Sequence, residues 1–381
     1  MENKDLSSLV NLRQELHKNP ELSGVEFNTS NTIREFIQKT EPDLIIENLG
    51  GTGLAAVYKF PNPGKSITIR CELDALPIRE VNDFNHRSKT DGVSHKCGHD
   101  GHMAIVAGLS LWLKEKRFTA GQVVLLFQPA EENGEGAKRV VKDERFRNLK
   151  TDYVFALHNI PKVPMHTIIS MENGFSSEVQ SFIIEMHGKE SHAAEPENGI
   201  NPALAISEVI ESLAHLQKKD TNHKDFCVIT PVHVHMGDKS YGISPADGEQ
   251  HYTLRTWNNE KMELVKSKIE KQVEKICQQH QLEHSISWLE YFPASINDAE
   301  SNAIVEGAAK ENGYNLLVNP HPFKFGEDFG WYAKEYKTAM FGLGAGEETP
   351  ALHNPDYDFP DELIETGLNM FKSIVSDILK G

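Results

Sequence analysis

The chain has 381 residues, a formal net charge of −17 and a hydrophobic fraction of 39%, with 18 histidines and 4 cysteines. A chain of this length is expected to form two or three domains around a large core, and its apolar content excludes disorder. The acidic balance argues against a partner such as nucleic acid or an anionic membrane, because phosphate contacts need clustered lysine and arginine.

The amino terminus and the cysteines predict a cytoplasmic location. Residues 1–18 are charged and helix-patterned, without the apolar stretch of a secretory signal. No segment is apolar for long enough to predict a membrane span. The four cysteines lie far apart in the sequence, and isolated cysteines in a chain of this size are typical of reduced thiols. We therefore expect a cytoplasmic protein without a membrane or nucleic-acid partner.

Strands alternate with helices along the first part of the chain. Hydrophobic periodicity predicts helices near 6–16, 33–37, 102–116 and 136–147, and strands at 54–60, 66–73, 122–127 and 153–157. Several of these strands are entirely apolar, which is typical of a parallel sheet that is buried on both faces. This order of elements indicates an α/β domain with a mostly parallel sheet.

The pattern changes between residues 177 and 292. The strands expected there cover 179–187, 226–235, 249–257 and 284–291, and the helices cover 202–217 and 260–280. This β-α-β-β-α-β order is that of a ferredoxin-like unit, which can fold as a compact domain. A strand at 338–343 and a helix at 361–379 then resume the α/β pattern. We expect an α/β domain, residues 1–176 and 293–381, interrupted by an inserted α+β domain, residues 177–292.

Metal-binding residue types are densest in the segment His95-Lys96-Cys97-Gly98-His99-Asp100-Gly101-His102, just before a predicted helix. Thiolate and imidazole are preferred ligands of zinc and related metals. The two glycines allow a turn tight enough for neighbouring side chains to converge on one ion. Taken alone, the segment fits equally well a polar loop with one buried cysteine and some exposed histidines.

Further polar residues follow predicted strands or a glycine-rich run, namely Glu72 and Asp74, Glu131 and Glu132, His158 with Asn159, and His353. In open parallel sheets, ligands bind beyond the carboxyl ends of the strands. Adjacent carboxylates can divide their work, because one can coordinate a metal while the other holds a water for proton abstraction. Solvated turns and hydrogen-bonded structural histidines are the alternatives at each position. Together the positions favour a metal-dependent hydrolytic site.

Eight motifs in order carry a family resemblance: LRQELHKNPELSGVE, IRCELDALPIRE, HKCGHDGHMA, FQPAEENGEGAK, FALHN, GKESHAAEPENGINPALA, FGEDFG and LHNPDYDF. The chain resembles the amidohydrolase branch of the aminoacylase/carboxypeptidase-type dinuclear metallopeptidases. That branch includes N-acyl-amino-acid amidohydrolases, hippurate hydrolases and auxin-conjugate hydrolases. The resemblance implies a zinc-peptidase-like catalytic domain with a mostly parallel sheet, interrupted by a ferredoxin-like lid. It also implies a homodimer formed through this lid domain.

Carried over by position, the resemblance implies a site for two divalent ions made by Cys97, His99, Glu132, His158 and His353. The Cys97 thiolate would lie between the ions, where related branches use a carboxylate. Glu131 is implied as the general base that takes a proton from a metal-held water, and Asp74 as a carboxylate that orients the site. Zinc and manganese are expected first, and mixed Cys, His and Glu ligation also allows cobalt and nickel.

Two residues of the inserted domain are implied to contact the substrate. His192 matches a lid histidine that reaches the substrate carbonyl in relatives, often across a dimer, and would stabilise the oxyanion. The alternative for His192 is a loop residue that caps the helix beginning near Asn201. The fork of Arg255 suits a substrate carboxylate, although a structural ion pair fits as well. The chain departs from many relatives at 242–245, where Gly-Ile-Ser-Pro replaces Asn-Val-Ile-Pro.

The sequence therefore predicts a metal-dependent amidohydrolase that cleaves an N-acyl amino acid to a carboxylic acid and a free amino acid. A metallo-dipeptidase or carboxypeptidase on the same fold is the alternative among enzymes, because the departures in the lid leave the substrate open. A structural zinc site and a non-catalytic metal-containing binding protein are further alternatives. Glu131 beside Glu132 argues against the binding protein, since a structural site needs no extra base.

Overall fold

A computed structural model describes residues 3–115, 118–171 and 173–379 of the chain. The chain forms two compact units: unit 1 lies within residues 1–175, 295–322 and 327–381, and unit 2 within residues 176–294 and 323–326. No helix in the described part of the chain is long and apolar enough to cross a membrane. The predicted α/β class is confirmed, because the central sheet of unit 1 is largely parallel.

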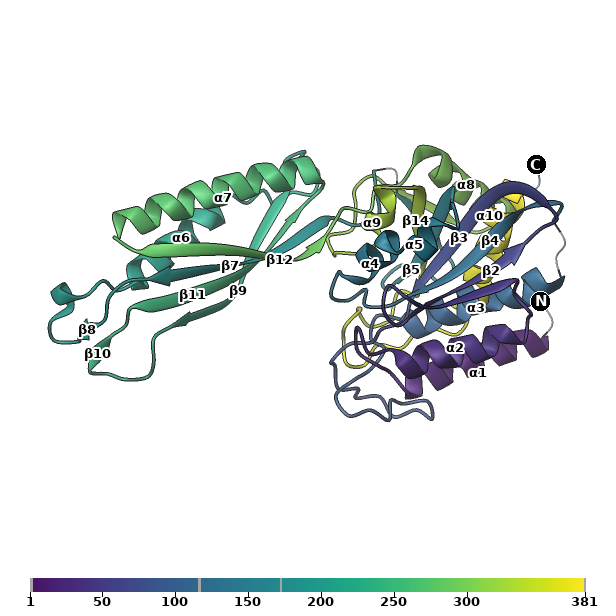
Figure 1. Ribbon diagram of the computed structural model, residues 1–381, viewed down its shortest axis with the longest axis horizontal. Helices are drawn as coiled ribbons and strands as arrows, with labels where there is room; N and C mark the ends of the chain where they lie inside the picture. The colour runs from purple at the N-terminus through teal and green to yellow at the C-terminus, as the bar shows by residue number, and fades with distance from the viewer. Residues whose placement is uncertain (1–2, 116–117, 172, 380–381) are drawn as a thin grey trace. The chain divides into compact units, whose positions relative to one another are not determined.

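Unit 1 is built around an eight-stranded sheet with the order β1-β2-β4-β3-β5-β14-β6-β13 (Figure 1). The strands are β1 (Leu44–Leu49), β2 (Gly53–Lys59), β3 (Asn62–Glu72), β4 (Ala120–Gln128), β5 (Tyr153–Ile160), β6 (Ile168–Met171), β13 (Leu316–Asn319) and β14 (Lys337–Gly344). The four central strands, β4, β3, β5 and β14, run parallel to one another. Their carboxyl ends therefore meet at one edge of the sheet, as in other open α/β sheets.

Helices pack on this sheet and complete the core of unit 1. They are α1 (Asn3–Lys18), α2 (Phe27–Gln38), α3 (His99–Glu115), α4 (Gly136–Lys142), α5 (Glu144–Arg147), α8 (Ala299–Glu311), α9 (Gly330–Ala333) and α10 (Leu363–Leu379). Leu9 of α1, Ile105 of α3 and Leu368 of α10 are buried in one cluster with Ile67 and Ile69 of β3. Because strand residues alternate between faces, Arg70 of β3 projects from the other face of the sheet.

The helix expected at 136–147 is in fact two helices, α4 and α5, separated at Asp143. Asp143 has an extended backbone, with φ −71° and ψ 120°, and its side chain accepts a hydrogen bond from the backbone N–H of Arg145. An aspartate in this conformation is a favourable N-cap, so it starts a new helix instead of continuing the first one. The spacing of hydrophobic residues alone does not predict such a capping hydrogen bond.

Unit 2 contains the predicted β-α-β-β-α-β order of elements. They are β7 (Glu178–His187), α6 (Ala203–His215), β9 (Cys227–Met236), β11 (Asp247–Thr256), α7 (Asn259–Gln279) and β12 (Glu283–Phe292). The four strands form an antiparallel sheet with the order β12-β7-β11-β9, so β9 lies at an edge.

Helices α6 and α7 cover one face of the unit 2 sheet (Figure 1). Tyr252 and Leu254 of β11 are buried in the same cluster as Val209 of α6 and Ile269 of α7. Glu249 and His251 alternate with these buried residues, so they project from the opposite face of the sheet. The role of residues 177–292 as a lid and dimerisation domain stays a prediction.

Candidate metal centre

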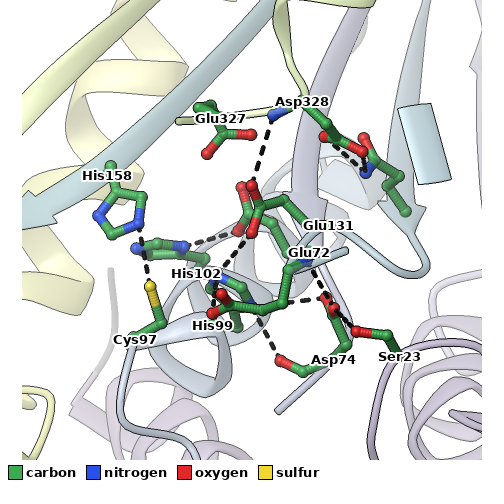
Figure 2. Close-up of polar contacts among 12 residues, drawn as sticks. Ser23, Glu72, Asp74, Cys97, His99, His102, Glu131, His158, Glu327 and Asp328 are labelled. Carbon is green, nitrogen blue, oxygen red and sulfur yellow. Dashed lines mark hydrogen bonds and ion pairs between the residues drawn. The ribbon is translucent and has the colours of Figure 1, made fainter. Parts of the chain in front are cut away.

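The site residues predicted in unit 1 gather at the carboxyl edge of its parallel strands. Asp74 follows β3, Glu131 and Glu132 follow β4, and His158 lies near the end of β5. Cys97 lies in the loop before α3, and His99 is the first residue of α3, the helix that follows β3 along the chain. Figure 2 shows Cys97, His99, Glu131 and His158 gathered around one centre, with Asp74 beside them. Residues that are far apart in the sequence thus lie together at one edge of the sheet.

Cys97, His99 and His158 form the first group of ligand atoms. One ligand atom of each lies within 4.8 Å of the others, and all three residues are buried. Sγ of Cys97 is 3.4 Å from Nε2 of His158. A single cation could therefore contact a thiolate and two imidazoles here, which is a combination that zinc and related metals favour.

Backbone carbonyls determine which nitrogen of each histidine faces the centre. Nδ1 of His99 lies 2.8 Å from the carbonyl oxygen of Asp74, and Nδ1 of His158 lies 2.9 Å from the carbonyl oxygen of Asn159. A carbonyl only accepts hydrogen bonds, so each Nδ1 carries a proton and donates it. Nε2 of each ring is then left as the nitrogen that can bind a metal. Contacts of this kind fix the orientation of metal-binding histidines.

Cys97, Glu132 and His353 form a second group of ligand atoms within the same distance limit. Oε1 of Glu132 is 3.8 Å from Nε2 of His353 and 3.9 Å from Nε2 of His99. The backbone N–H of His353 donates to the carbonyl of Lys96 at 2.8 Å, which holds His353 beside Cys97. His353 has a φ of 66°, a left-handed conformation that costs a histidine energy and is common at functional sites.

Asp74 connects several parts of the centre. Its Oδ2 accepts hydrogen bonds from Oγ of Ser23 at 2.7 Å and from the backbone N–H of Glu132 at 2.9 Å. Oδ1 lies 3.6 Å from Nδ1 of His99. Asp74 thus contacts the backbone of one candidate ligand and the ring of another, which suits the orienting role implied by the resemblance.

Glu131 lies beside the ligand groups with its carboxylate turned toward His99. Its Oε2 is 3.9 Å from Nε2 of His99, and its Oε1 lies 3.4 Å from the backbone N–H of Asp328. Burial, together with the negative charges of Glu327 and Glu132, holds the pKa of Glu131 well above its ordinary value. A carboxyl in this environment takes up a proton readily, as a general base must.

Burial and neighbouring acidic groups shift the pKa values of the candidate ligands. Burial raises the pKa of Glu132 to about 7, with the charge of Asp74 adding to the effect. Burial opposes charge on His99, but the side chain of Asp74 and the charge of Glu72 outweigh it and raise the pKa of His99 to about 10. A metal ion can displace the proton from such a buried carboxylate and neutralise its negative charge. The centre is therefore a favourable environment for cations.

Unpartnered atoms at the centre also fit bound cations. Among the residues that the structure describes, Nε2 of His99, Oε1 of Glu132 and Oδ1 of Asp74 are buried without a hydrogen-bond partner. A buried polar atom without a partner is unfavourable, and a metal ion is one group that would satisfy it. The thiolate, imidazole and carboxylate donors therefore fit the two divalent ions expected from the sequence.

A buried ionic network that we did not predict from the sequence adjoins the centre. The guanidinium of Arg70 pairs with Glu72, with Glu327 at 2.9 Å and with Asp328 at 2.7 Å. Glu72 in turn lies 2.7 Å from Nδ1 of His102. Glu327 and Asp328 lie in the FGEDFG motif, one of the motifs that carry the family resemblance, so the sequence marked both residues as candidates. A single arginine inside a strand carries no such signal, so only the fold reveals the position of Arg70.

His192 and Arg255 belong to unit 2. His192 lies on β8 (Ser191–His192), opposite Ile243 of β10 (Ile243–Ser244), and is exposed. The alternative that His192 caps α6 is wrong, because the first amide of α6 donates instead to the side chain of Asn201. Nη1 of Arg255 donates to the carbonyl of Lys324 at 2.8 Å. Contact of either residue with a substrate stays a prediction.

Comparison with known proteins identifies the relatives of the chain. Residues 68–377 match peptidase family M20/M25/M40. The chain is 29% identical to an N-acetylcysteine deacetylase of Bacillus subtilis, over 98% of this chain and 97% of that protein. It is also 29% identical to the hippurate hydrolase of Campylobacter jejuni, over 97% of this chain and 96% of that protein.

A solved structure supports the same relationship. It is a Bacillus subtilis protein described as a dinuclear metal-binding peptidase of the M20 family. Its chain is 28% identical to this one and superposes with a TM-score of 0.85, covering 100% of this chain and 99% of its own. The family resemblance inferred from the motifs is thereby confirmed.

Proposed function

The chain belongs to peptidase family M20/M25/M40, a family of hydrolases that act on amide bonds, and we propose that its substrates are N-acyl amino acids. Hydrolysis would release a carboxylic acid and the free amino acid. The names of two relatives support this class, because N-acetylcysteine and hippurate are both N-acyl amino acids. The observation that carries the proposal is the pair of ligand groups that share Cys97, with Glu131 beside them.

The residues that would hold two divalent ions are Cys97, His99, Glu132, His158 and His353. Cys97 belongs to both ligand groups, which supports a role for its thiolate as a ligand in each of them. When bound, such ions polarise a substrate carbonyl and lower the pKa of water from 15.7 toward about 7. Zinc and manganese suit this donor set, and cobalt and nickel are compatible with it.

Glu131 would move the proton during hydrolysis. It would accept a proton from the attacking water and deliver that proton to the leaving nitrogen. Its raised pKa, caused by burial and by neighbouring Glu327 and Glu132, allows it to hold the proton between these two steps. Asp74 would keep His99 and Glu132 in place through the hydrogen bonds described above.

Two residues of unit 2 complete the proposed mechanism. His192 would donate a hydrogen bond to the oxyanion that forms on the substrate carbonyl, a contact worth roughly 3–4 kcal/mol in other enzymes. Arg255 would bind the carboxylate of the amino-acid part. Its Nη1 donates a hydrogen bond to the backbone carbonyl of Lys324, a neutral partner that leaves the charge of the guanidinium uncompensated.

We also infer a homodimer that forms through unit 2. Strand β9 lies at the edge of its sheet, and Val232 and Val234 of this strand are 60% and 44% exposed. Leu204 of the neighbouring helix α6 is 72% exposed. An exposed edge strand with apolar side chains is prone to pair with another chain. We infer that this chain is a second copy of the same protein, because a second copy is always present in solution.

A substrate panel tests the proposed activity. The enzyme reconstituted with zinc or manganese is offered N-acetyl, N-benzoyl and long-chain N-acyl amino acids, and dipeptides. We expect kcat/KM for the best N-acyl amino acid to exceed that for every dipeptide by at least about tenfold, a typical discrimination between pockets. A preference for dipeptides would overturn the proposed substrate class and favour the dipeptidase alternative.

A further inference from the structure

A second group of metal-binding residue types lies in unit 2, on the sheet face opposite α6 and α7. Strands β9 and β11 are antiparallel, with His233 directly opposite His251 and His235 directly opposite Glu249. The four side chains therefore occupy adjacent positions on one sheet face. Directly opposite residues have Cβ atoms about 4.5–5.5 Å apart, which is close enough for two side chains to contact one ion.

The side-chain atoms of three of these residues converge. Nε2 of His233 is 3.5 Å from Oε1 of Glu249, and Nε2 of His251 is 3.7 Å from the same oxygen. The rings of the two histidines meet edge to face, with centroids 5.2 Å apart. Ligands of a tetrahedral zinc ion lie about 3.3 Å apart, given bonds of about 2.0–2.1 Å. The observed separations are close to that value.

Hydrogen bonding does not account for this arrangement. Both nitrogen-to-oxygen separations lie at or beyond the usual limit for a hydrogen bond. Nε2 of His251 is covered from solvent and has no hydrogen-bond partner among the residues that the structure describes. A covered imidazole nitrogen that points at a carboxylate and a second imidazole is the arrangement expected around a cation.

The surroundings of the group favour a cation as well. His235 and Glu249 line a cavity of about 310 Å³, which is also lined by Glu185, Asp238 and Asp247. Carboxylates gathered around one cavity concentrate positive ions there. The ring of His235 is parallel to that of His233, with centroids 6.4 Å apart, which places a third imidazole next to the group.

We propose that His233, His251 and Glu249 bind a divalent transition-metal ion, with His235 available as a fourth ligand. Imidazole and carboxylate donors suit zinc, nickel and copper, whereas calcium and magnesium need more oxygen ligands. The ion would link the edge strand β9 to its neighbour β11. This site shares no residue with the Cys97 centre and does not depend on the proposed function.

Zinc stoichiometry tests the proposal. The untagged full-length protein, with its Cys97 centre first filled with zinc and freed of excess metal, is titrated with zinc chloride in a calorimeter. We expect the unmutated chain to bind one more equivalent of zinc than either the His233→Gln or the His251→Gln variant. His280→Gln is the matched control, because it removes a unit 2 histidine that pairs with Glu208 at 2.9 Å, and it should keep the extra equivalent.

Thermal unfolding is the second measurement. Zinc should raise the Tm of the unmutated chain and of His280→Gln, because an ion that binds the folded chain stabilises it. The same zinc concentration should not raise the Tm of His233→Gln. The proposal would be overturned if the unmutated chain and its three variants bound the same number of zinc equivalents. It would also be overturned if zinc raised the Tm of His233→Gln as much as that of the unmutated chain. Each variant should keep the far-ultraviolet circular dichroism of the unmutated chain, since each substituted side chain is at least partly exposed.

Discussion

Nδ1 of His99 lies 2.8 Å from the backbone carbonyl oxygen of Asp74, to which it donates a hydrogen bond. The carboxylate of the same aspartate accepts a hydrogen bond from the backbone N–H of Glu132 at 2.9 Å. One residue thus holds two of the proposed metal ligands through different atoms. Its backbone directs Nε2 of His99 into the centre, and its side chain fixes the turn that carries Glu132.

Asp74→Asn should weaken both metal binding and turnover. The substitution keeps the backbone carbonyl but removes a negative charge beside His99 and Glu132. Changes to groups that orient metal ligands typically cost about 10–100-fold in affinity or activity, and we expect a loss of kcat in that range. Metal analysis and steady-state kinetics measure it. Ser23→Ala removes one donor to the same carboxylate and should cost less. Unchanged kcat and metal content in Asp74→Asn would exclude the orienting role.

Glu131→Gln should strongly slow hydrolysis while the protein keeps its metals. The amide is similar in size to the carboxylate but cannot accept the proton, so we expect kcat to fall by about 10²–10⁴-fold. The metal content should equal that of the unmutated enzyme. Glu135→Gln is the control, because Glu135 follows the same turn as the N-cap of α4, is partly exposed and contacts Lys138 at 3.4 Å. Loss of metal in Glu131→Gln would instead make Glu131 a ligand.

Removal of metal should stop catalysis without unfolding the protein. The ligands lie at the edge of the sheet, whereas residues such as Leu9, Ile105 and Leu368 form a separate apolar core. A chelator should therefore lower Tm, but cooperative unfolding should persist, and added zinc or manganese should restore activity. Circular dichroism and activity on the same sample measure both effects. A chain that unfolds when metal is removed would favour the structural-zinc alternative.

His192→Ala should reduce kcat without changing the metal content. Loss of an oxyanion donor in other enzymes lowers kcat by about 10²–10³-fold, and we expect an effect of that size. His187→Ala is the matched control, because His187 is another exposed histidine of unit 2 that pairs with Asp247 at 2.7 Å. If the two variants have the same kcat, His192 does not contact the oxyanion.

Val234→Asp should convert the proposed homodimer into monomers. The substitution places a charge on the exposed edge strand β9, where burial against a second copy would be unfavourable. Size-exclusion chromatography with light scattering measures the mass. Leu289→Asp on β12, at the opposite edge of the sheet, should remain dimeric. A monomeric unmutated chain, or a dimeric Val234→Asp variant, would contradict this interface.

Much of the fold and the candidate centre could be predicted from local patterns. Alternating strands and helices indicated the parallel sheet, because buried parallel strands need apolar side chains on both faces. The spacing of Cys97 and His99, and the polar residues after strand ends, indicated the metal centre because parallel strands bring their carboxyl ends together. These features depend on residues that are near in sequence or on a general rule of topology.

The tertiary structure alone decided which distant side chains meet. Arg70 contacts Glu327 and Asp328 across more than 250 positions of sequence, and no local pattern predicts that pairing. The register of β9 against β11, including a bulge beside His251, decides that His233 faces that residue. A shift of one residue would turn these histidines to the other face of the sheet. Residue types follow from sequence, but their partners depend on strand register and on long-range packing.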